Sequence, residues 1–263
     1  MRLLPVLLCA AALPWTAPAV DTGDFRWHGR VKPGDVIELK GVNGAIIAQP
    51  APGNEVEVSA HKSGHRSDPE SVRVDVVEHN GGVTICALYP DSMLRRNTCK
   101  PGEGGHNNVS NNDVQVQFTV RVPAGVRFVG RTVNGDIQTG SLKSDVEAYT
   151  VNGNVKVNTA GTALAAKTVN GSVEAALGST NWKRPAEFSS VNGTVSLELP
   201  TKASADVHAS TVNGRIKTDF PLEVTGKFAG RHVNGRIGNG GPELKISTVN
   251  GSINLRQQGG PLI

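Results

Sequence analysis

Seven histidines and a few carboxylates are the residues of this chain whose types suit metal binding or catalysis. His61 and His65 have the four-residue separation of a helical metal site, but the Lys-Ser-Gly between them predicts a loop. No H-E-x-x-H sequence occurs, and no cysteine pair lies nearby. We therefore predict no metal site, no catalytic set and no cofactor.

One pair of glutamates has a spacing that catalysis could use. Glu147 and Glu187 occupy the same place relative to a repeated motif, two repeats apart. At a strand spacing of about 4.8 Å they would lie roughly 10 Å apart, and carboxylate pairs cleave glycans in many enzymes. A solvated sheet face is the simpler interpretation. We predict that the protein is not an enzyme, with a polysaccharide-active β-helix enzyme kept as an alternative.

A candidate ligand loop lies at Trp182, Lys183 and Arg184, within an insertion between two repeats. A tryptophan beside two cations can hold a sugar or an anionic polymer by stacking and charge. The alternative is that Trp182 folds back and covers apolar surface.

The N-terminus and the cysteines predict the compartment. Residues 1–19 have the basic, apolar and small-residue regions of a signal peptide, with cleavage after Ala19. Cys9 leaves with this leader, and the remaining Cys86 and Cys99 predict a disulfide in an oxidising compartment. The apolar run is too short to span a membrane. We expect an exported protein of the periplasm, cell envelope or medium, with no transmembrane span in the mature chain.

Charge and composition narrow the partners. The net charge is +4, and the basic residues are scattered without a nucleic-acid-binding motif, which excludes a nucleic-acid partner. A basic chain is attracted to acidic polymers and surfaces. The partner is unknown, with a glycan, another cell-envelope polymer or an envelope protein as candidates.

The tripeptide Val-Asn-Gly recurs through the chain and dominates its organisation. After the first copy and a gap of 91 residues, the spacings are 18, 18, 22, 21, 21 and 16. The residues six before and three after each later asparagine are apolar, and threonine stands two before it in five of seven copies. A period of this length is typical of solenoids and propellers. The predicted repeat corners are Asn43, Asn134, Asn152, Asn170, Asn192, Asn213, Asn234 and Asn250.

Two all-β architectures fit this pattern. Asn-Gly is a strong signal for a two-residue hairpin turn, but a hairpin would place the identical valines on its wetter face. In a parallel β-solenoid the valine would turn into the core, and asparagine would stack on asparagine in consecutive coils, linked by side-chain amides. Stacked repeats cover one another and together offset the entropy of ordering. We predict a right-handed parallel β-solenoid.

The chain divides into three predicted segments. Residues 1–19 are the signal peptide, 20–122 an irregular N-terminal β region with the disulfide, and 123–263 the regular repeats. A degenerate copy at Asn80-Gly81 leaves open whether the N-terminal region holds irregular rungs or a small antiparallel sheet.

The T-V-N-G repeats, the leader and the Cys86–Cys99 segment resemble a bacterial family of putative adhesins of unknown function. The resemblance covers roughly residues 31–255 and implies a β-solenoid in the cell envelope, without catalytic residues to carry over. We therefore predict a non-catalytic adhesin or binding scaffold. The alternative that the resemblance keeps open is an envelope-stress sensor acting through a protein partner.

Overall fold

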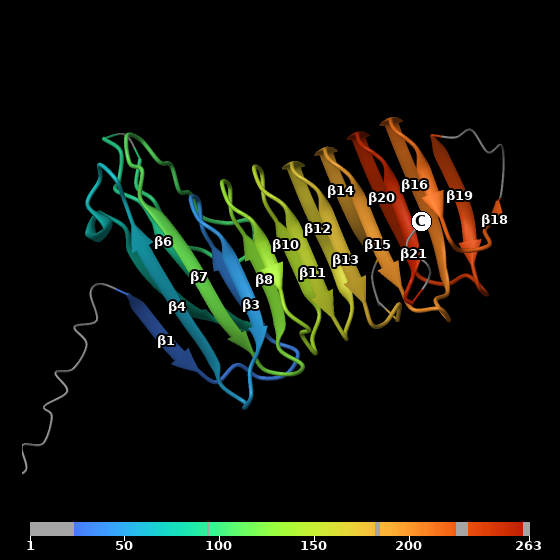
Figure 1. Ribbon diagram of the computed structural model, residues 1–263. Coiled ribbons are helices and arrows are strands. Elements are labelled where there is room, and N and C mark those ends of the chain that lie inside the picture. The colour runs from blue at the N-terminus through green and yellow to red at the C-terminus, as the bar shows by residue number, and fades with distance from the viewer. Residues whose placement is uncertain (1–23, 94, 182–184, 225–230, 260–263) are drawn as a thin grey trace, which may run out of the picture.

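The computed structural model describes residues 24–93, 95–181, 185–224 and 231–259, which form two long β-sheets around one core (Figure 1). The only helical segment among them is a 3-10 turn, Pro69–Ser71. The predicted all-β solenoid is confirmed.

The first sheet has ten strands, whose order in space is β1 (Phe25–Gly29), β4 (Val56–Ser63), β7 (Gln115–Val122), β3 (Ile46–Pro50), β9 (Ile137–Thr139), β11 (Val155–Thr159), β13 (Val173–Leu177), β15 (Val195–Leu199), β21 (Ile253–Gln257) and β17 (Ile216–Thr218). The second has eleven, in the order β18 (Glu223–Val224), β19 (His232–Ile237), β16 (Ala205–Asn213), β20 (Glu243–Asn250), β14 (Ala186–Asn192), β12 (Ala163–Asn170), β10 (Val146–Tyr149), β8 (Arg127–Arg131), β2 (Val36–Lys40), β6 (Gly82–Leu88) and β5 (Arg73–His79).

A rung of the solenoid consists of one strand from each sheet, joined at an Asn-Gly corner except in the β6–β7 rung, where the segment that contains the disulfide loop joins the two strands. Neighbouring rungs are parallel, so equivalent residues become partners: Val155 pairs with Val173, and Val173 with Val195. The described residues of the two predicted apolar columns are buried, except the half-buried Ile216. The repeat thus forms a continuous core in which each rung covers its neighbours.

Antiparallel strands cover both sheets at the N-terminal end of the solenoid and the second sheet at the other end, where the first sheet ends in β17, parallel to β21. At the N-terminal end β4 pairs antiparallel with β7, β1 with β4, and β5 with β6. Asn80-Gly81 is the turn between β5 and β6, so this degenerate copy is a hairpin rather than a corner. At the other end β19 pairs antiparallel with β16, and β18 with β19. Such strands protect the open sheet edges from pairing with other chains.

The rungs do not stack in chain order, as consecutive coils would. The β2–β3 rung lies between the β6–β7 and β8–β9 rungs, although β6 and β7 come later in the chain. The β20–β21 rung lies between the β14–β15 and β16–β17 rungs. The prediction of strictly consecutive coils was therefore wrong at both ends. Both sheets also continue past residue 122, and the proposed boundary there stays a prediction.

Asn234 was wrongly predicted as a corner. It lies within β19, opposite His208 of the antiparallel β16, and its side-chain Oδ1 contacts His208 Nδ1 at 3.0 Å. This copy of the motif is therefore part of the antiparallel strand that covers the end of the second sheet. Such a strand stops further rungs from stacking there.

Candidate functional site

The corner asparagines form a ladder along the solenoid. Each Nδ2 donates to the Oδ1 of its neighbour, and all six bonds are 2.8 Å long. The order of the ladder is Asn43, Asn134, Asn152, Asn170, Asn192, Asn250 and Asn213. It follows the rung order in space rather than in the chain, and the asparagines from Asn134 onward are exposed.

The threonine and glycine of the motif have roles inside the stack. Thr150 is buried, and its hydroxyl donates to the carbonyl oxygen of Gly135 in the next rung at 2.8 Å. Ser190 makes the same bond to Gly171 at 2.7 Å. A Cβ added at Gly153 would lie 2.2 Å from the Gly135 oxygen, so only glycine allows this close approach of backbones.

The valine of the motif faces solvent in six of the eight copies, contrary to the prediction that it turns into the core; Val42 is half-buried, and Val233, in the covering strand β19, is buried. The strand extends to the corner asparagine, so side chains keep alternating between the two faces as far as the valine, and only the asparagine departs from the alternation. The threonine therefore takes the inward position, and the valine after it points outward. We call the exposed row the valine stripe: Val133, Val151, Val169, Val191, Val249 and Val212, with exposed fractions from 36% to 54%.

The valine stripe is regular and long. Its six members stand on neighbouring rungs, beside the asparagine ladder. At a strand spacing of about 4.8 Å, the row extends over roughly 24 Å. These side chains are the large exposed apolar residues of the described chain, together with Met93.

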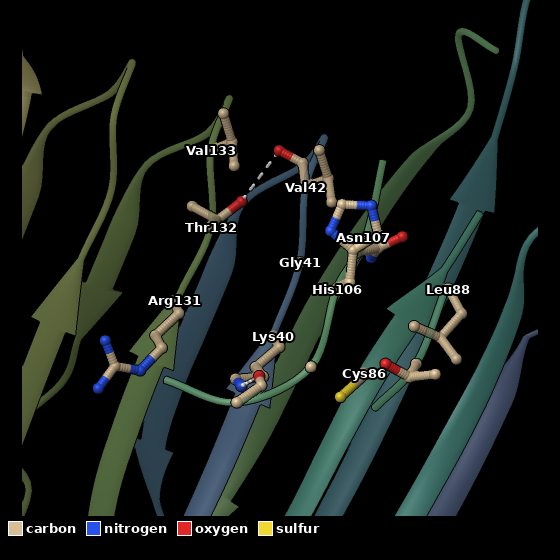
Figure 2. A pocket seen from close by; sticks show the side chains of 13 residues that line it. Lys40, Gly41, Val42, Cys86, Leu88, His106, Asn107, Arg131, Thr132 and Val133 are labelled. Carbon is tan, nitrogen blue, oxygen red and sulfur yellow. Dashed lines mark hydrogen bonds between the residues drawn. The ribbon is translucent and has the colours of Figure 1, made fainter. Parts of the chain in front are cut away.

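A cavity of about 200 Å³ lies at one end of the stripe, where the loop closed by the disulfide crosses the sheet (Figure 2). Cys86 and Cys99 are bonded, with their Cα atoms 5.7 Å apart. His106 and Asn107 of the loop line the cavity together with Val42, the half-buried valine of the first copy. The loop therefore ends the exposed row, which begins with the next valine.

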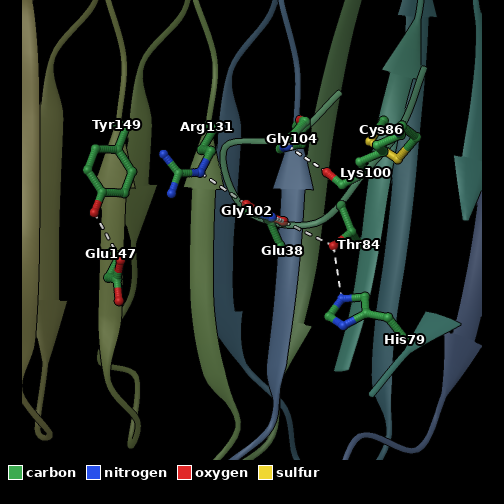
Figure 3. A network of polar contacts seen from close by, with 12 residues as sticks. Glu38, His79, Thr84, Cys86, Lys100, Gly102, Gly104, Arg131, Glu147 and Tyr149 are labelled. Carbon is green, nitrogen blue, oxygen red and sulfur yellow. Dashed lines mark hydrogen bonds and ion pairs between the residues drawn. A yellow bond between two sulfur atoms is a disulfide. The ribbon is translucent and has the colours of Figure 1, made fainter. Parts of the chain in front are cut away.

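The side chain of Glu38 connects several segments at this end of the molecule by hydrogen bonds (Figure 3). It is 3% exposed, and its carboxylate accepts hydrogen bonds from the Thr84 hydroxyl at 3.0 Å and the Gly102 amide at 2.9 Å. Arg131 Nε donates to its other oxygen at 3.0 Å. One buried charge thus joins three strands and the disulfide loop. The alternation of Ile37, Glu38 and Leu39 indicated an outward residue but not its burial by a distant loop.

Lys40 and Arg131 are neighbours on the sheet at the cavity. Lys40 Nζ donates to the carbonyls of Lys100 and Gly104, at 2.7 and 2.8 Å. Burial lowers the pKa of Lys40, because desolvation penalises its charge, although nearby Glu38 acts in the opposite direction. The guanidinium of Arg131 lies 4.1 Å from the centroid of the Tyr149 ring.

The other candidate chemical groups do not converge. Glu147 and Glu187 lie on either side of Ala165 on the sheet. Glu147 accepts a hydrogen bond from Tyr149, and Glu187 pairs with Lys167. No group of three metal-binding side chains occurs within the described ranges.

The remaining predicted residues have simple positions. His61 lies in β4 and contacts Asp24 Oδ1 at 2.7 Å, while His65 follows that strand in an exposed turn. Trp182, Lys183 and Arg184 lie outside the described residues, as does the predicted signal peptide. Within the described part of the chain, the structure contains no helix that could span a membrane.

Comparison with known proteins identifies one family. The sequence profile of Toastrack DUF4097 matches residues 107–256, which include the corners from Asn134 to Asn250. No curated protein matches the chain.

Several solved bacterial structures are similar to this chain along most of its length. One from Clostridium sporogenes, described as a putative cell adhesion protein, has 12% identity and a TM-score of 0.45, covering 89% of this chain and 99% of its own. A putative adhesin from Bacteroides fragilis has 14% identity and a TM-score of 0.33, covering 90% and 97%. A putative lipid binding protein from Parabacteroides distasonis has 12% identity and a TM-score of 0.27, covering 89% and 97%.

Proposed function

This chain belongs to the Toastrack family DUF4097, and from its surface we propose that it is a non-catalytic cell-envelope protein that binds a linear glycan along the valine stripe. In this role it is an adhesin or a binding scaffold. An exported location is supported by the signal-peptide pattern of residues 1–19 and by the Cys86–Cys99 disulfide.

The observation that carries the proposal is the exposure of the valines. Threonine, asparagine and glycine each have a structural role in the stack, as hydrogen-bond donor, amide ladder and point of close approach. Six valines on neighbouring rungs instead leave a third or more of their surface in water. Contiguous exposed apolar surface of this kind is typical of interaction sites.

A linear glycan matches the repeat of this surface better than a globular protein does. The stripe offers a valine and an asparagine amide at every rung, so the same pair of contacts recurs about every 4.8 Å. Valines can pack against the apolar faces of sugar rings while amides bond to hydroxyls. The row is narrow, whereas a stable protein interface buries at least about 1,000 Å².

The non-catalytic part of the proposal is supported by the state of the carboxylates. Glu38, Glu147 and Glu187 each have a hydrogen-bond or ion-pair partner on the sheet. A glycosidase needs two carboxyl groups that face one scissile bond from a common cleft.

The test replaces three neighbouring valines, Val133, Val151 and Val169, by serine. We expect the variant to stay folded, because these side chains are exposed, and to bind insoluble β-1,4-linked glycans at least about tenfold more weakly, a loss of about 1.4 kcal/mol. Pull-down isotherms with the processed, oxidised chain measure this.

The matched control replaces Gln138, Lys156 and Glu174 by serine, since these exposed residues are neighbours on the opposite sheet. Its binding should equal that of the wild type. A valine variant that binds as well as the control contradicts the stripe, and release of soluble sugar by the wild type contradicts the non-catalytic role.

A further inference from the structure

The cavity at the closed end of the valine stripe differs from the stripe in its chemistry. It has a volume of about 200 Å³, and its lining includes Lys40, Val42, His106, Arg131 and Val133. Val133 belongs to the stripe as well, so a chain lying along the valines leads directly into the cavity (Figure 2).

The charges at the cavity favour an anion. Lys40 and Arg131 line it, and its described lining contains no carboxylate. Glu38 lies beneath and neutralises one of the two charges through its bond to Arg131 Nε. Two cations and one carboxylate leave a net charge of one positive at this end of the stripe.

The lysine is placed where an anion would stabilise it. Its ammonium group is partly desolvated and bonded to two loop carbonyls, which carry only partial charge. An ammonium group has three N–H donors, so one remains for a ligand. A charge-assisted bond to a ligand carboxylate is stronger than a bond to a neutral group.

The disulfide loop determines which part of a polymer can reach this place. It lines the cavity beside the half-buried Val42, and Leu88 on the neighbouring strand is buried, so the exposed apolar row ends at Val133. A sugar next to Lys40 then lies at the end of the row, where a terminal sugar fits. Since the stripe itself is uncharged, the acidic group is needed only at that end.

We propose that this cavity receives the carboxylate-bearing terminal sugar of the linear glycan, so that the chain is recognised by its end as well as along its length. This inference rests on the proposed glycan-binding function of the valine stripe. Lys40 contacts the carboxylate, and the next sugars lie over Val133, Val151 and the following valines.

The experiment compares three β-1,4-linked glucose hexamers by calorimetry with the full processed chain. One is neutral, one carries a single glucuronic acid at its non-reducing end, and one carries it at an internal position. We expect the terminal-acid hexamer to bind about tenfold more tightly than the other two, as one charge-assisted bond provides. The same comparison with the acid at the reducing end determines the direction of the chain.

A charge variant locates the effect. Lys40→Gln keeps a side-chain donor for the loop carbonyls and removes the positive charge, so it should abolish the preference for the terminal acid but leave binding of the neutral hexamer intact. Lys156→Gln, on the exposed face of the opposite sheet, is the matched control and should keep the preference.

The outcomes separate the two proposals. If the neutral hexamer binds and is lost in the valine variant, but neither acid position is preferred, the end-recognition site is overturned and the stripe remains. Equal gains from terminal and internal acids indicate general charge attraction and also overturn it. If no hexamer binds, both proposals fail. If Lys40→Gln still prefers the hexamer with the terminal acid, Lys40 does not contact the carboxylate and the proposed site is overturned.

Discussion

Each threonine of the motif stabilises the neighbouring rung through a single hydroxyl. The carbonyl oxygen of Gly135 lies at the corner, and the buried Thr150 hydroxyl is a donor that reaches it. A buried carbonyl without a donor costs free energy comparable to its lost hydration. The hydroxyl therefore accounts for a polar residue at an inward position.

Thr150→Val keeps the shape of the side chain and removes this donor. We expect the free energy of unfolding to fall by about 1–3 kcal/mol, measured by urea denaturation. Thr150→Ser keeps the hydroxyl, as Ser190 does naturally, and should lose clearly less stability. Equal stability of the valine variant and the wild type would contradict the role of the hydroxyl.

The inward threonine could have been predicted from the sequence by parity alone. The residue six before the asparagine is apolar and inward, so those four and two before it share its face. We instead assigned the valine to the core because it is apolar. That choice neglected that a strand can extend to the asparagine itself, as β12 and β14 do, when the neighbouring rung satisfies its backbone. The presence of valine in every copy of the motif nevertheless indicated that this position has a specific role.

The disulfide loop is the element that shapes the candidate site. Its contacts with the sheet are polar: Glu38 bonds to the Gly102 amide, and Lys40 to two loop carbonyls. These bonds join residues about 60 positions or more apart in the chain. The cysteine pair was predictable from its spacing and compartment, but the position of the loop over β2 was not, because no local pattern encodes such distant contacts.

Replacing Cys86 and Cys99 by alanine releases this loop. We expect a loss of about 3 kcal/mol of stability, which the chain-entropy model gives for a loop of this size. Amide hydrogen exchange should accelerate in residues 98–107 and not in the rungs beyond β10. Unchanged exchange in the loop would mean that the polar contacts alone hold it in place.

The rung that comes last in the chain, β20–β21, connects the C-terminal strands to the rest of the solenoid. Within the described residues, sheet pairing connects the β16–β19 unit to the main body only through β20 and β21. The repeat spacing predicted these strands and the core columns. It could not predict their order, because equivalent strands of a regular repeat can pair with one another in several orders at similar cost.

Truncation after Pro242 removes β20 and β21. We expect the β16–β19 unit to detach, since it then has no neighbouring rung, while residues 24–199 stay folded. Limited proteolysis should cleave within residues 205–237 and spare the body. The exposed edges of β14 and β15 should also promote association of the truncated chains. A truncated protein that resists cleavage throughout would contradict this dependence.

The two inserted rungs restrict how such an array can change its length. A new repeat stacked after β21 would have to displace the β16–β17 rung, and one placed before β2 would have to displace the β6–β7 rung. Only the middle, from β8 to β15, has rungs in simple succession, where duplicating or deleting one copy shifts the rest by a single strand spacing. Longer and shorter relatives should therefore differ by internal copies, and the valine stripe would lengthen or shorten with them while the strands at the two ends of the solenoid stay the same.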